Sequence, residues 1–200
     1  MKYWIEKGAE PSKLLLGMAA YGHGFILADE KENGFYAKTN GPIEGGPYTR
    51  ERGMWGYNEY CEFMKGDPQW EFHRVRIFSV PICFSATSHI RQPSLVSTTF
   101  WLIVGNLLKN DWSVAPYVVN GRKWFGFDDE YSIANKSQYI LDMGLGGGMI
   151  WSVDTDDYKG FCGKKFGVLA TMNQVLNGGP QTPPPGLSTN PILLPFFTFV

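Results

Sequence analysis

The segment GGGMIWSVDTDD, residues 146–157, determines how the rest of the chain is interpreted. Its glycines lead into an apolar run that ends at Trp151, which is typical of a buried strand, and three aspartates follow at once. Trp151 is therefore either a core residue or the floor of a ligand site with the acidic loop above it. The aspartates of this loop are expected to cap and to accept hydrogen bonds, and Asp157 to brace the loop.

The elements expected around this strand form a βαβα unit. Residues 2–8 end a helix, and the remaining elements are a strand at 14–21, a hairpin at 115–129 around Asn120-Gly121, a helix from Ser132 to Met143 stopped by Gly144, the strand 147–153 and a helix from Lys165 to Leu176. With the long insertion set aside, this order predicts a parallel α/β fold, in which sites lie at the C-terminal ends of strands. Tyr21 and Trp151 both fall at such ends.

Composition excludes several classes of function. The net charge of −1 in 200 residues gives no basic footprint for a nucleic acid. The longest apolar run, Leu95 to Leu108, is interrupted by polar residues and too short to span a bilayer, so no membrane partner is expected. The first residues carry charges where a signal peptide has its apolar region. An aromatic content of 16% with 24 glycines favours either sugar-binding surfaces or ordinary core packing.

No cofactor or metal is expected. His23, His73 and His89 share no metal-ligand spacing with the cysteines. The glycines of 144–148 precede a strand instead of opening a helix, which is the wrong context for a phosphate-binding loop.

Three segments carry a family resemblance: KLLLGMAAYGHGF (13–25), GPYTRERGMWGYNEYC (46–61) and WFGFDDEYSIANKSQYILDMGLGGGMIWSVDTDDYKGFCG (124–163). Together they resemble glycoside hydrolase family 18 chitinases and chitinase-like proteins of animals, particularly arthropods. The resemblance implies an α/β fold in which residues 1–178 are the C-terminal part of a (β/α)8 TIM barrel, with strands seven and eight. Residues 26–126 are then an inserted α+β domain, and the barrel is incomplete.

The same resemblance implies a binding site for chitin or N-acetylglucosamine oligomers. Trp151 is then the floor under the sugar at the cleavage point and Tyr21 a side wall, and Glu51 and Met54 contact sugars on the leaving side. His23 stands where the family commonly has Arg, so an imidazole replaces a guanidinium group, which is always charged and carries several N–H donors.

No catalytic residue is identified in this chain. The family's Asp-x-x-Asp-x-Asp-x-Glu cluster, which supplies the proton donor, and its MxYD motif are both absent. A complete barrel needs roughly 250 residues, so the missing strands are expected upstream of Met1 in a longer parent. Two interpretations stay open: a chitinase that hydrolyses β-1,4-linked N-acetylglucosamine polymers, of which this chain is an inactive part, or a non-catalytic chitinase-like lectin.

The cysteine count is odd. The family pattern implies a disulfide between Cys61 and Cys162, which predicts a secreted, extracellular parent. Cys83 is left over in a stretch, 75–109, that contains no Asp or Glu and matches nothing in the family. We interpret 75–109 as a non-native insertion, a translated intron, and 179–200 as a Pro/Thr-rich linker and tail.

Overall fold

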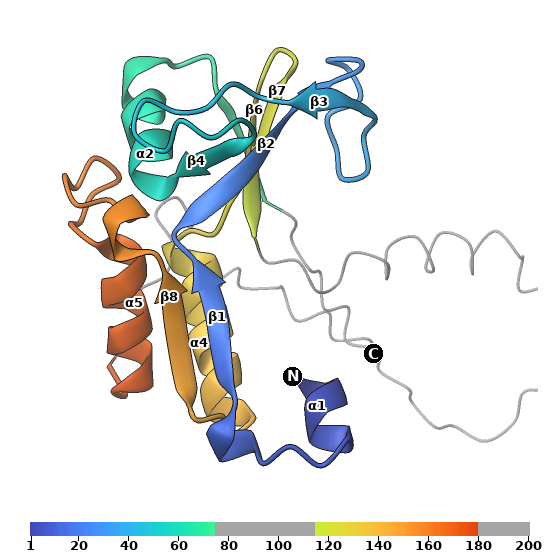
Figure 1. Ribbon diagram of the computed structural model, residues 1–200. Helices are drawn as coiled ribbons and strands as arrows, with labels where there is room; N and C mark the ends of the chain where they lie inside the picture. The colour runs from blue at the N-terminus through green and yellow to red at the C-terminus, as the bar shows by residue number, and fades with distance from the viewer. Residues whose placement is uncertain (75–114, 180–200) are drawn as a thin grey trace, which may run out of the picture.

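The computed structural model describes residues 1–74 and 115–179, which form two sheets flanked by helices (Figure 1). Cys83, the rest of 75–109 and the tail beyond 179 lie outside the described residues. No helix in the described ranges is long and apolar enough to cross a membrane. The elements are α1 (Lys2–Glu6), η1 (Pro11–Lys13), β1 (Leu15–Ala19), β2 (Tyr21–Leu27), β3 (Thr39–Pro42), β4 (Met54–Gly56), α2 (Tyr57–Gly66), β5 (Glu71–Arg74), β6 (Pro116–Asn120), β7 (Lys123–Gly126), α4 (Glu130–Asp142), β8 (Gly147–Trp151), η2 (Val153–Thr155) and α5 (Gly167–Leu176).

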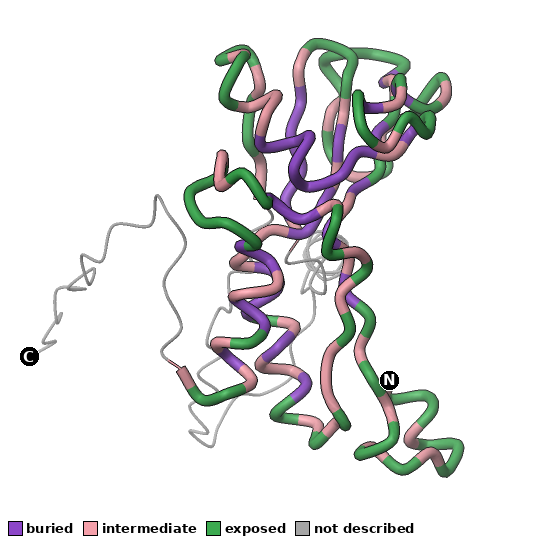
Figure 2. Tube along the Cα trace, turned by 60° about the vertical axis from the view of Figure 1, so that its left-hand side comes forward, coloured by how far each residue is buried: buried purple, intermediate pink, exposed green. Residues whose placement is uncertain are grey.

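β1 and β8 form a two-stranded parallel sheet, as expected for 14–21 and 147–153. One face packs on α4 and α5, through residues such as Met18 and Ile150. The opposite face carries Leu15, Met149 and Trp151, which are exposed. Figure 2 shows buried residues in purple along the helices and in the antiparallel sheet. Parallel strands are normally covered on both faces. An open pair of this kind is consistent with part of a TIM barrel accompanied by an α+β insertion.

The second sheet is antiparallel, with strand order β3-β2-β7-β6-β5, and β4 pairs with β2. The predicted hairpin is confirmed: β6 and β7 pair around Asn120-Gly121, and Gly121 adopts a φ of 54°. One face of this sheet packs on α2 through a cluster of aromatic side chains, Trp55, Tyr57, Tyr60, Phe125 and Phe127. This cluster is part of the main core of the described residues.

The prediction that Tyr21 ends the first strand is wrong. β1 ends at Ala19, and Tyr21 is the first residue of β2 in the other sheet. The change of sheet occurs at Ala20, which is fully buried. Its N–H donates to the carbonyl of Trp151, and its own carbonyl accepts from the N–H of Tyr57, both at 2.9 Å. Ala20 therefore links the end of β8 to the start of α2, at the point where the chain passes from one sheet to the other.

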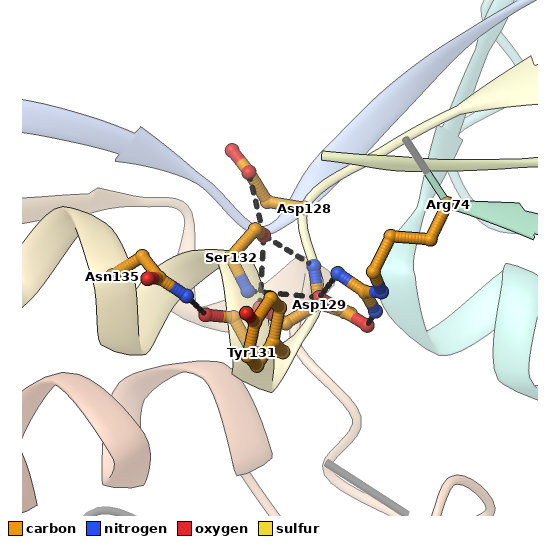
Figure 3. Close-up of polar contacts among 6 residues, drawn as sticks. All are labelled: Arg74, Asp128, Asp129, Tyr131, Ser132 and Asn135. Carbon is orange, nitrogen blue, oxygen red and sulfur yellow. Dashed lines mark hydrogen bonds and ion pairs between the residues drawn. The ribbon is translucent and has the colours of Figure 1, made fainter. Parts of the chain in front are cut away.

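The helix α4 begins earlier than predicted, because Asp129 and not Ser132 is its N-cap. The Asp129 carboxylate accepts the N–H of Ser132, and the Ser132 hydroxyl accepts the N–H of Asp129, which is a reciprocal capping box. The Arg74 guanidinium forms an ion pair with Asp129, and it lies over the ring of Tyr131 (Figure 3). This contact fixes β5 of the antiparallel sheet to the start of α4. Gly144, with a φ of 59°, ends the helix as predicted.

The disulfide between Cys61 and Cys162 is confirmed, with the two Cα atoms 5.2 Å apart. It joins α2 to the loop that follows η2, across a sequence separation of 101 residues. Closing so long a loop removes much conformational freedom from the unfolded chain, and a crosslink of this span stabilises by about 4–5 kcal/mol in the chain-entropy model.

Replacing both cysteines, as Cys61→Ser with Cys162→Ser, is therefore expected to lower the free energy of unfolding by about 4–5 kcal/mol. Urea denaturation followed by tryptophan fluorescence measures this loss. Cys83→Ser is the matched control, since Cys61 and Cys162 are bonded to each other. An equal loss in that control would contradict the assignment of the crosslink.

Candidate functional site

Trp151 is the last residue of β8, and its side chain is 66% exposed. Gly148 and Ile150 face the helices, because a Cβ at Gly148 would lie 2.7 Å from the Met172 sulfur and Ile150 packs against the main core. Alternation along the strand therefore directs Trp151 to the opposite, open face. The Trp151–Ser152 peptide bond is cis. In the described part of the chain the indole is thus outside the core.

Tyr21, His23 and Met54 meet on neighbouring strands. His23 lies opposite Met54 in the β2–β4 register, and Tyr21 lies opposite Gly56. The rings of Tyr21 and His23 contact edge to face, with centroids 5.6 Å apart. His23 Nδ1 lies 3.2 Å from the carbonyl oxygen of Gly53. In the neutral ring Nδ1–H donates to that carbonyl, which leaves Nε2 as an acceptor.

Glu51 lies on the exposed turn that leads into Met54, and its carbonyl accepts the Met54 N–H at 3.2 Å. Two residues of this turn adopt positive φ, Arg50 at 56° and Gly53 at 81°. Glu51 is exposed, and within the described ranges its position is set by the conformation of its turn. Of the five predicted site residues, the structure brings Tyr21, His23 and Met54 together on neighbouring strands. Glu51 precedes Met54 by three residues in the sequence.

The turn is held from below by Glu59, which sequence reasoning missed. The Glu59 side chain is fully buried, and its carboxylate accepts the N–H groups of Tyr48 at 2.6 Å, Thr49 at 2.9 Å and Gly56 at 2.7 Å. Gly46 passes so close that an added Cβ would lie 2.3 Å from the carboxylate. Glu59 therefore positions the segment that carries Glu51 and Met54.

Two of the three aspartates after β8, Asp156 and Asp157, have the hydrogen-bonding roles predicted for them, whereas Asp154 is exposed and accepts from Asn58 through its main-chain carbonyl. Asp156 is buried and accepts the N–H groups of Val168 at 3.3 Å and Leu169 at 2.9 Å, at the start of α5. Asp157 is also buried and accepts from Gly160 at 2.8 Å and Cys162 at 2.7 Å, so it braces the loop. Both carboxylates are thus buried and engaged by backbone N–H groups, which is a structural role.

Glu130 is the described carboxyl whose pKa is raised, chiefly by burial and against the opposing charge of Lys164. A raised pKa suits a general acid. However, Glu130 begins α4 and packs against α5, where a Cβ at Gly167 would lie 2.3 Å from its carboxylate oxygen. It therefore lies in the helical layer, whereas the indole of Trp151 projects from the other face of β8.

Among the described residues, Cys61, Asp157 and Cys162 come close enough together to be considered as metal ligands. The two sulfurs are bonded to each other, and Asp157 already accepts two backbone N–H groups. The two cysteines therefore serve as a crosslink, and Asp157 holds the loop beside it.

Removing the charge of Glu59 is expected to loosen the turn that carries Glu51. Glu59→Gln places an amide NH2 among backbone donors, and we expect a loss of about 3 kcal/mol in the free energy of unfolding. Faster hydrogen exchange at the amides of Tyr48 and Thr49 would accompany it. Glu62→Gln, on the exposed side of the same helix, is the control and should cost less than about 1 kcal/mol. Equal effects in the two variants would refute the positioning role.

The residues 1–156 match the family model of "Glycosyl hydrolases family 18". The chain is 32% identical over 182 residues to chitotriosidase-1 of Mus musculus, covering 90% of this chain and 30% of that protein. It spans less than a third of the length of the curated relatives it matches.

Solved structures give the same assignment. The Ostrinia furnacalis Group IV chitinase, also solved with allosamidin, superposes with a TM-score of 0.68 at 30% identity, over 88% of this chain and 38% of that one. Human YKL-39, described as a pseudo-chitinase with retained chitooligosaccharide binding, superposes with a TM-score of 0.65 at 29% identity, over the same shares of the two chains. The chain therefore belongs to glycoside hydrolase family 18 and is part of a catalytic domain of the chitinase and chitinase-like type.

Proposed function

We propose that this chain supplies the floor and one wall of a chitin-oligosaccharide cleft. In this proposal β1 and β8 are strands seven and eight of a (β/α)8 barrel, within a C-terminal part of the catalytic domain that spans 1–178. Residues 26–126 form the inserted domain, and 75–109 are a translated intron that RNA sequencing across positions 74–110 would reveal. The open face of β1 and β8 supports the barrel assignment, since the remaining strands would cover it.

The observation that carries the proposal is the exposed indole of Trp151 at the C-terminal end of β8. The C–H face of a pyranose ring is apolar, and an indole face matches it in area and in quadrupole. Tyr21, His23 and Met54 stand on the adjoining strands, where they would contact the same sugar chain from the side. Glu51 would reach in from the turn above Met54 and accept a hydrogen bond from a sugar hydroxyl.

Hydrolysis is assigned to the longer parent and not to this chain. Family 18 chemistry resembles the substrate-assisted exception, in which the substrate's acetamido oxygen attacks while a carboxylic acid protonates the leaving group. The sequence lacks the family's acidic cluster, so we assign no such acid to this chain. The alternative is that the parent is a non-catalytic lectin. This alternative is retained because the similar human YKL-39 is a pseudo-chitinase with retained chitooligosaccharide binding. The strand-four segment of the parent distinguishes the two.

We infer that the parent is exported. A disulfide that spans 101 residues and joins two parts of the fold is typical of proteins that mature in an oxidising compartment. Similarity to an oviduct-specific glycoprotein of Mesocricetus auratus supports this inference.

Trp151→Ala is expected to weaken binding of an N-acetylglucosamine hexamer about thirtyfold, because truncating a stacked aromatic anchor typically costs ~2 kcal/mol or more. Isothermal titration calorimetry measures the change. Trp4→Ala is the matched control, since Trp4 on α1 is 60% exposed and lies outside the proposed cleft. Unchanged affinity in a folded Trp151→Ala protein would remove the tryptophan from the site.

The purified chain is expected to release no product from a fluorogenic chitobioside. General acid assistance contributes ~10²–10⁴-fold to such reactions, and the sequence lacks the family's acidic cluster. Turnover that rises with protein concentration, and that Trp151→Ala reduces, would show that an acid exists in this chain.

A further inference from the structure

The exposed face of β2 continues past Tyr21 and His23 to Phe25. Gly22 and Gly24 turn the other way, because a Cβ on them would lie 2.5 Å from the ring of Phe125 and 2.0 Å from Ile43 in the core. Phe25 itself is 38% exposed. A strand rises about 3.3 Å per residue, so Phe25 stands roughly 13 Å beyond Tyr21 along β2. Figure 1 shows β2 running from its junction with β1 to its pairing with β3.

Trp124 extends this face sideways. It lies opposite Phe25 in the β2–β7 register, with ring centroids 6.2 Å apart. Its indole leans over Gly126, where an added Cβ would lie 2.5 Å from the ring. Gly126 in turn lies opposite His23. The indole of Trp124 therefore lies over Gly126, in the space that a larger side chain at that position would fill.

The loop before β3 completes a shallow hollow of about 200 Å³, whose aromatic lining is Phe25, Phe35, Tyr36 and Trp124. Tyr117 supports it from beneath, stacked on Trp124 with centroids 5.2 Å apart and edge to face with Phe35 at 5.1 Å. Tyr36 is 86% exposed, so its ring reaches into solvent. The hollow is thus aromatic, held by packing below and open above.

The size and position of the hollow indicate its occupant. At about 200 Å³ it is smaller than the roughly 300–1,000 Å³ of a pocket for a drug-sized ligand. It lies on the same strand face as Tyr21 and His23, with no change of sheet between them. A flat aromatic surface that continues a proposed sugar cleft suits a further pyranose ring of the same oligosaccharide.

We propose that Phe25, Tyr36 and Trp124 form a distal sugar platform, which binds units of a chito-oligosaccharide beyond those held at Trp151, Tyr21 and Met54. The inference rests on the proposed function of that cleft. The platform would make the affinity of the chain for an oligomer depend on the length of that oligomer. Short oligomers would occupy only the cleft, and longer ones would also stack on the platform.

The test compares an N-acetylglucosamine dimer with the hexamer by isothermal titration calorimetry on the full chain. Phe25→Ala and Tyr36→Ala are each expected to weaken hexamer binding about tenfold and to leave dimer binding unchanged. Tyr36 is so exposed that its truncation leaves the core intact, so it decides the question if Phe25→Ala fails to fold. Phe72→Ala is the matched control, because Phe72 is 49% exposed on β5 of the same sheet.

The outcomes separate the two levels of the proposal. If the wild-type chain binds the hexamer, and Trp151→Ala weakens this binding but Tyr36→Ala does not, the distal platform is overturned and the cleft is kept. Equal weakening of dimer and hexamer by Tyr36→Ala would also overturn it, since the residue would then belong to the central cleft. Absence of binding of either oligomer to the wild-type chain would overturn the proposed function, and the platform with it.

Discussion

Two backbone hydrogen bonds of Ala20 set the geometry on which the candidate site depends. Ala20 donates to the carbonyl of Trp151 and accepts from the N–H of Tyr57, and its position between β1 and β2 makes it the junction of the two sheets. The proposed floor and the proposed wall therefore share one buried residue. Since both bonds are made by the main chain, the side-chain requirement at this point is only that it be small enough to remain fully buried.

The rest of the interface between the sheets reinforces this junction through α2. The disulfide from Cys61 holds the helix to the loop after η2, and Asn58 Nδ2 donates to the carbonyl of Asp154 at 3.4 Å. Gly56 allows the start of the helix to approach Thr155, since an added Cβ would lie 3.2 Å from the threonine side chain. Among residues 1–74 and 115–179, no element covers the second face of β1 and β8, so these links, together with the packing of α4 and α5, hold Trp151 in place.

Features that depend on neighbouring residues were predictable from the sequence, and most of those that depend on distant partners were not. The Asn120-Gly121 hairpin and the stop at Gly144 follow from local pattern. The parallel pairing of β1 with β8 followed from the βαβα order of the elements, and the disulfide followed only from the family. The bend at Ala20 could not be predicted, because its two partners lie far along the chain. The helix α2 was missed since it begins within a Gly-rich stretch, although Glu59, three residues after its N-cap Gly56, is a capping signal.

The arrangement separates binding from chemistry in physical terms. In the proposed cleft the indole of Trp151 would contact a sugar ring before and during bond cleavage, so its stacking energy would be largely uniform and would strengthen binding without accelerating the chemical step. A proton donor acts only as the glycosidic bond breaks, and it comes from a different strand of the barrel in the family pattern. A protein can therefore lose the acid and keep the floor and the wall. In the proposed function the residues of this chain would therefore affect which oligosaccharides are held, whereas hydrolysis would require a proton donor such as the family's acidic cluster, which is absent from this sequence.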